Sequence, residues 1–188
     1  MRSGGRGLGA DGAAAILGLL VWARPAGAEP QASVGLTGGA SFGVVGPESE
    51  TTLHLGARAD VLLLRQRERD MAVGPYVDVG TPGFHDVALG GGGEWLIPVT
   101  EDVPVVASAG VFARPGAGAA WRPGIEGTVF CGSRSYNFHS WYGLGAGVFV
   151  QSRWLPGSPA TLDVVAGVQV DVALVAMPFL LAFEAVAH

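Results

Sequence analysis

Residues 32–44 read ASVGLTGGASFGV, and residues 162–172 read LDVVAGVQVDV. In the first stretch, Val34, Leu36 and Phe42 alternate with serine, threonine and glycine. Because successive side chains of a β-strand point to opposite faces, a period of two predicts a strand with one apolar face and one polar or small face.

The same alternation recurs along the chain, in residues 52–63, 71–80, 86–97, 103–113, 121–131 and 141–151. Stretches rich in Gly, Pro and charge separate these segments, for example 46–50 and 114–120. Strands of about ten residues have the length that a tilted strand needs to cross a bilayer. Eight of them joined by short connections predict an all-β protein, an up-and-down antiparallel transmembrane β-barrel of the smallest membrane class.

The polar parity indicates which face lies inside. It is dominated by small residues, which suit the narrow interior of an eight-stranded barrel. A basic side chain on the lipid face costs about 2–4 kcal/mol at mid-membrane, so charges belong in the lumen. The rival architecture is a soluble, lipocalin-like barrel with its apolar face inside. The charged residues predicted to form a polar network in the lumen are Arg58, Asp60, Asp78, Asp86, Glu94, Arg122, Glu126, Arg153, Asp163 and Asp171.

The composition indicates that much of the protein surface is not exposed to water. Charged residues make up 14% of the 188 residues, against about 25% in a typical soluble domain. The chain has 31 glycines, no lysine and a net charge of −5, which argues against nucleic-acid binding. The longest apolar run after the N-terminal region, Val172–Phe183, contains Pro178 and is too short for a spanning helix.

The first 28 residues predict a secretory signal peptide. Arg2 and Arg6 give a positive start, residues 13–23 (AAAILGLLVWA) form a short apolar core, and Ala26-Gly27-Ala28 supplies a cleavage site. The expected mature chain therefore begins at Glu29 and forms one barrel domain over residues 29–188. The alternative is an uncleaved N-terminal anchor.

A signal peptide followed by eight glycine-rich alternating segments resembles the small outer-membrane β-barrel superfamily, of the OmpA/OmpX type. The resemblance implies a bacterial outer-membrane protein whose partners are outer-membrane lipid and the assembly machinery. The chain departs from the family by ending in residues 183–188 (FEAVAH) rather than in an aromatic residue. With both termini periplasmic, the long 132–140 connection also falls on the unexpected side. A ten-stranded barrel that uses residues 175–186, or a shifted topology, is therefore an alternative.

Three functions follow from this architecture. The first is a non-enzymatic envelope protein whose inward charges fill the barrel as paired groups. The second is a narrow pore for small solutes or ions. The third is a lipid-modifying hydrolase, since lipid A deacylases share the architecture and His139 and Ser140 are adjacent. The spaced His-x-Ser pattern of those enzymes is absent, however, and neighbours on a strand point to opposite faces.

Other residues receive structural predictions. No catalytic residue, metal site or cofactor is expected. His54 is expected to be a hydrogen-bonded inner-face histidine, Cys131 an inert lipid-facing thiol, and residues 90–93 close-packing glycines where strands bend. The segment-end aromatics Trp95, Trp121, Tyr142 and Trp154 are candidates for interfacial belts.

Overall fold

The protein forms a closed barrel of eight antiparallel strands, followed by one helix. The computed structural model describes residues 29–45, 48–84, 86–100, 103–115, 120–135, 141–157 and 160–187. The predicted leader, residues 1–28, lies outside this part of the chain. The elements are β1 (Gln31–Val45), β2 (Glu48–Leu62), β3 (Ala72–Pro82), β4 (Ala88–Pro98), β5 (Pro104–Pro115), β6 (Trp121–Arg134), β7 (Gly145–Leu155), β8 (Thr161–Asp171) and α2 (Val172–Ala187).

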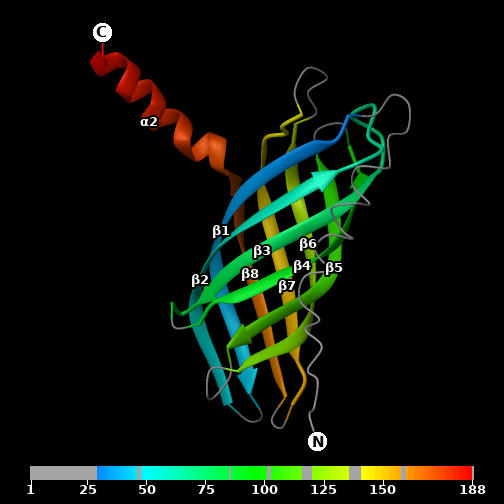
Figure 1. Ribbon diagram of the computed structural model, residues 1–188, viewed down its shortest axis with the longest axis vertical. Helices are drawn as coiled ribbons and strands as arrows, with labels where there is room; N and C mark the ends of the chain where they lie inside the picture. The colour runs from blue at the N-terminus through cyan, green and yellow to red at the C-terminus, as the bar shows by residue number, and fades with distance from the viewer. Residues whose placement is uncertain are drawn as a thin grey trace, which may run out of the picture.

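Each strand pairs with the next one in sequence, and β8 pairs with β1 to close the barrel (Figure 1). The predicted eight-stranded up-and-down barrel is therefore confirmed. We call the rim that holds the start of β1 and the end of β8 the terminal rim. Strands β2, β4 and β6 also end at this rim. The opposite rim, where β1 leads into β2 and β7 leads into β8, is the open rim.

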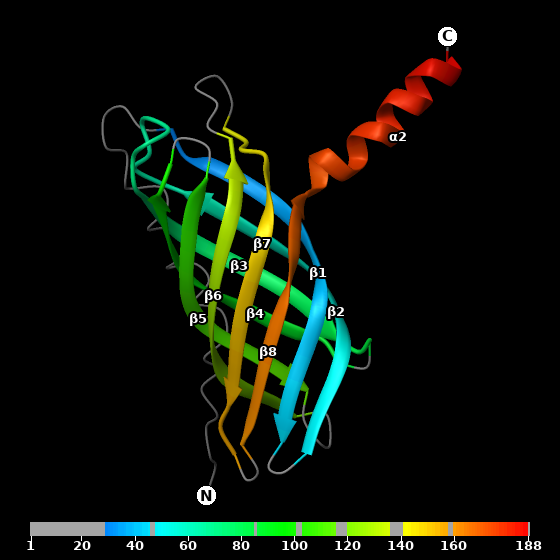
Figure 2. The ribbon, with the colours of Figure 1, turned by 180° about the vertical axis from the view of Figure 1, so that it is seen from behind.

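The ten-stranded alternative is wrong, because residues 175–186 lie within helix α2. The run from Val172 loses the period of two and is continuously apolar, with Ala, Leu and Met favouring a helix. Asp171 also caps it, since its carboxylate accepts a hydrogen bond of 2.8 Å from the backbone N–H of Ala173. Helix α2 points away from the barrel at the terminal rim (Figure 2). Among the described residues, no helix has the length and hydropathy needed to span a membrane.

Strand β7 begins four residues later than the predicted segment at 141. The inward and outward faces predicted for β7 are correct. Trp141, Tyr142 and Gly143, however, do not belong to β7 but lie against β1. The N–H of Ala32 donates to the carbonyl of Trp141, and the N–H of Gly143 donates to the carbonyl of Ala32. This segment takes the place of β8, which stops opposite Gly35 and leaves the first residues of β1 without a strand neighbour on that side.

The two faces of the wall differ as the alternation predicts. The outward positions expose large apolar side chains, while every charged side chain of the eight strands occupies an inward position. Trp95, Trp121 and Trp154 are exposed near strand ends, whereas Tyr142 is half-buried and bonded to Asp171. Exposed members of the outer band include Leu53, Val77, Val111, Ile125, Val129, Val148, Val150 and Val168.

Inward glycines face one another across alternate strand pairs. A methyl group at Gly92 would overlap the carbonyl oxygen of Ala109, and the other facing glycines are similarly close to backbone or side-chain atoms. These glycines therefore let the wall bend tightly. Of the run 90–93, Gly92 has the close packing that was expected, whereas Gly93 points outward with its nearest neighbour atom 4.0 Å away. The facing pairs are Gly39–Gly167, Gly56–Gly80, Gly92–Gly110 and Gly132–Gly147.

Candidate functional site

The inward charges divide into a buried network, a cavity at the open rim and one carboxylate at the terminal rim. Of the ten candidate residues, six meet in the network. Asp163, Arg122 and Asp86 lie at the open rim, and Asp171 lies at the terminal rim. We call the following set the interior ion-pair network: Arg58, Asp60, Asp78, Glu94, Glu126, Arg134 and Arg153.

One part of the network lies toward the terminal rim. Arg58 donates to Glu94 at 2.9 Å. Arg134 pairs with Asp60, stands 4.0 Å from Glu94 and donates to the Ser33 hydroxyl at 2.7 Å. That hydroxyl in turn donates to Asp60 at 3.1 Å. All five side chains are buried, where water does not solvate a charge. Each of the four charged groups has a partner of opposite charge, which offsets the cost of burying it.

The second part lies at mid-height. Arg153 donates through Nε to Glu126 at 3.0 Å and through its terminal nitrogen to Asp78 at 3.1 Å. Gln151 donates to Asp78 at 2.8 Å. A side chain at Gly90 would overlap the Asp78 and Glu126 carboxylates, so this glycine provides the space that they occupy.

Tyr76 joins the two parts. Its hydroxyl donates to Glu126 at 3.0 Å, and the guanidinium of Arg58 lies 3.8 Å from its ring centroid. The cation–π contact and the hydrogen bond thus use the two ends of one side chain. The result is one continuous polar network that extends along the barrel interior.

Apolar side chains fill the remaining interior around the network. Phe149 lies edge-on to His54, with ring centroids 6.2 Å apart, and Thr37 lies 3.3 Å from the His54 ring nitrogen Nε2. Three cavities in this part are about 10 Å³ each, near the minimum for one water molecule. The buried apolar residues form two clusters: Leu62, Ala72, Leu96, Val106, Phe130, Phe149 and Val165, and then Ala88, Phe112 and Leu155.

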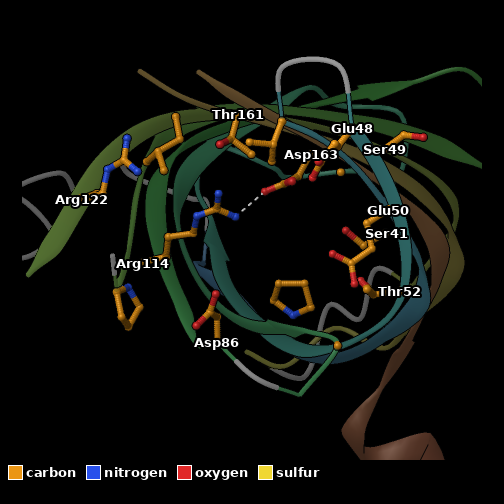
Figure 3. Close-up of a pocket in the computed structure, with 16 residues that line it drawn as sticks. Ser41, Glu48, Ser49, Glu50, Thr52, Asp86, Arg114, Arg122, Thr161 and Asp163 are labelled. Carbon is orange, nitrogen blue, oxygen red and sulfur yellow. Dashed lines mark hydrogen bonds and ion pairs between the residues drawn. The ribbon is translucent and has the colours of Figure 1, made fainter. Parts of the chain in front are cut away.

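The interior widens at the open rim. A cavity of about 570 Å³, which we call the mouth cavity, is lined by residues from both ends of the chain (Figure 3). Arg114 crosses it to pair with Asp163 at 2.7 Å. Arg122 lines it and donates to the backbone carbonyl of Pro156 at 3.0 Å. Asp86 also lines it, from the connection before β4 and not from that strand as predicted.

The remaining candidate, Asp171, fastens the terminal rim. Both of its carboxylate oxygens lie 3.0 Å from the Tyr142 hydroxyl, which also lies 3.2 Å from the backbone N–H of Val34. Burial and the hydrogen bond to Asp171 raise the pKa of Tyr142 above its usual value. Asp171 thus links the end of β8, the start of α2 and the 141–143 segment.

Sequence reasoning missed several members of the interior. Arg134 was assigned to the connection after residue 131, yet β6 extends to it and the inward parity of Glu126 continues through to it. Tyr76 and Gln151 lie on the predicted polar faces, but the predicted network contains charged residues alone and so omits them. Extending each alternation to its last matching residue would have found Arg134.

Two other expectations concern reactive side chains. Cys131 is exposed on the outward parity, as predicted. His139 and Ser140, the pair behind the hydrolase alternative, lie outside the described residues. Within the described part of the chain, no group of His, Cys, Asp and Glu is arranged to hold a metal ion.

Comparisons with known proteins add little to this geometry. No protein-family model and no curated protein matches the chain. Similar solved structures include Ail, the attachment invasion locus protein of Yersinia pestis, in complex with the heparin analogue sucrose octasulfate. It is 7% identical, with a TM-score of 0.46 over 76% of this chain and 99% of that chain.

Two de novo designs are also similar. A designed transmembrane β-barrel is 13% identical, with a TM-score of 0.39 over 77% of this chain and 99% of the design. The designed TMB2.3 is 15% identical, with a TM-score of 0.38 over 79% of this chain and 98% of the design. Because the similarity is this low, the chain is assigned to an architecture, the closed eight-stranded barrel, and its chemistry rests on its own residues.

Proposed function

We propose that this protein is an integral barrel of the bacterial outer membrane, sealed to solutes and without enzymatic activity, with a structural or binding role in the envelope. Its partners are then outer-membrane lipid around the wall and the assembly machinery that inserts it. The proposal takes residues 1–28 as a leader cleaved after Ala28 and places the terminal rim on the periplasmic side. The open rim then faces the outside of the cell.

The main support for a sealed barrel is that side chains fill its interior. Ion pairs cross the lumen at mid-height and toward the terminal rim, and two apolar clusters occupy the space around them. Cavities of about 10 Å³ between these groups hold at most about one water each. Eight-stranded barrels have interiors just wide enough for side chains, whereas aqueous channels need more strands.

Planar-bilayer recording tests the seal. We expect the purified mature protein, inserted in the bilayer, to give no steady single-channel steps. Folding is checked on the same preparation by heat-modifiable migration in gels, because a folded barrel resists unheated detergent, and insertion by co-flotation of the protein with lipid vesicles. Steady, reproducible steps from folded protein would overturn the sealed barrel and favour the pore.

Labelling of Cys131 tests whether the wall faces lipid. In phospholipid vesicles the folded protein is expected not to react with a membrane-impermeant maleimide, because the thiol of Cys131 faces acyl chains. After unfolding in urea it is expected to react fully. The control is Ser49→Cys combined with Cys131→Ser, which places the thiol at the open rim and is expected to react in the folded state. Rapid labelling of folded Cys131 would favour the soluble barrel instead.

A further inference from the structure

The mouth cavity has the size of a small-molecule site. Its volume of about 570 Å³ falls within the range of about 300–1,000 Å³ that is usual for ligand pockets. Leu155 lines the cavity and belongs to the buried apolar cluster with Ala88 and Phe112, which line an adjoining cavity of only about 10 Å³. A ligand would therefore enter from the open rim and stop there.

The wall of the cavity holds buried hydroxyl groups that are free to bind. Ser41 of β1 and Thr161 of β8 line the cavity, and only 3% and 5% of their surfaces are exposed. Neither hydroxyl has a hydrogen-bond partner in the described part of the chain, unlike that of Ser33 deeper in the barrel. Because both hydroxyls border the cavity and bond no other side chain or backbone group of the described residues, they are placed to bond a molecule there.

The charge that remains available in the cavity is negative. Four carboxylates and two guanidinium groups line it, which gives a net charge of −2. Arg114 is paired with Asp163, and Arg122 donates to Pro156. Three carboxylates have no ion-pair or hydrogen-bond partner among the described residues: Glu48, Glu50 and Asp86.

These carboxylates lie around the opening and not at one point. Glu50 comes from β2 and Asp86 from the connection before β4, and Figure 3 shows them on different sides of the cavity. Such spacing suits a ligand with more than one polar group better than a single metal ion. No aromatic side chain is among the described residues that line the cavity, so stacking on a flat ring does not select the ligand.

We propose that the mouth cavity binds small hydroxylated or extended organic amines, such as amino sugars and polyamines. Two ammonium groups of a polyamine pair with Glu50 and Asp86, whereas the single ammonium group of an amino sugar pairs with one of them. The ligand's hydroxyl or N–H groups bond Ser41 and Thr161. This proposal gives the binding role suggested above a ligand class. It rests on the proposed function only for the side of the membrane that the cavity faces.

Isothermal titration calorimetry of the folded mature protein in detergent tests this binding. The probes are glucosamine, spermidine and N-acetylglucosamine, the last of which keeps the sugar but removes the charge. We expect both amines to bind, and N-acetylglucosamine to bind at least about tenfold more weakly, because hydrogen bonds to charged groups contribute that much or more. Equal affinity for glucosamine and its acetylated form would overturn the charge-based selection.

Variants locate the site. Glu50→Gln and Asp86→Asn are each expected to weaken spermidine binding about tenfold, while Glu68→Gln, at the terminal rim, leaves it unchanged. Heat-modifiable migration confirms that each variant is folded. Absence of amine binding to the folded parent, or binding that both cavity variants leave intact, would reject the site. Either result leaves the conductance and labelling tests unaffected, so the sealed barrel is judged separately.

Discussion

The buried interior and the mouth cavity use the same residue types in opposite ways. In the interior, Arg58, Arg134 and Arg153 are buried and each pairs with one or two carboxylates. In the mouth, Glu50 and Asp86 are exposed and without partners among the described residues. Inward position alone therefore does not give a charge its role. The role follows from whether the facing strands bring an opposite charge within reach.

Removal of an interior arginine has the largest expected effect. Arg134→Met leaves Asp60 and Glu94 buried with less compensation, and we expect a loss of about 3–5 kcal/mol in the free energy of unfolding. Urea unfolding in phospholipid vesicles, followed by tryptophan fluorescence, measures it.

The matched change at the mouth is Arg122→Met, which removes one half-exposed hydrogen bond and is expected to cost about 1 kcal/mol or less. Adding Asp60→Leu to Arg134→Met removes the stranded charge and is expected to recover part of the loss. Equal costs for the two single variants would show that burial does not separate the two regions.

Substitution of two neighbouring glycines, Gly92 and Gly93, compares the packing on the inward and outward faces of the wall. Gly92→Ala places a methyl group against the backbone of β5, and we expect a cost of about 1–3 kcal/mol. Gly93→Ala points outward, where the nearest atom lies 4.0 Å from the added carbon, and is expected to be neutral or slightly stabilising. The same unfolding assay measures both. If Gly93→Ala cost as much as Gly92→Ala, the close strand approach would not explain the inward glycines.

A smaller effect is expected at the terminal rim. Tyr142→Phe removes the hydroxyl that donates to Asp171 and accepts from Val34, for a cost of about 0.5–1.5 kcal/mol. No measurable loss for Tyr142→Phe would contradict the assigned role of Tyr142 in fastening this rim.

The sequence by itself determined the wall of this barrel. Alternation in segments such as 32–44 and 162–172 decides which side chains face outward, because strand geometry has a period of two whatever the strand pairs with. The same rule placed Arg58, Glu94 and Arg153 inside. It also located Cys131 on the outer face.

Only the tertiary structure decided what the inward residues do. Arg134 meets Asp60 across 74 residues of sequence, and Tyr76 meets Glu126 across 50, because barrel closure brings distant strands face to face. The sequence also did not determine where the strands begin and end. The alternation runs without a break from residue 141 into β7, although residues 141–143 bond to β1 and β7 begins only at Gly145. The change from β8 to α2 depends on the Asp171 cap and on the end of pairing at Gly35. Such long-range contacts are set by register and closure, which the local pattern does not encode.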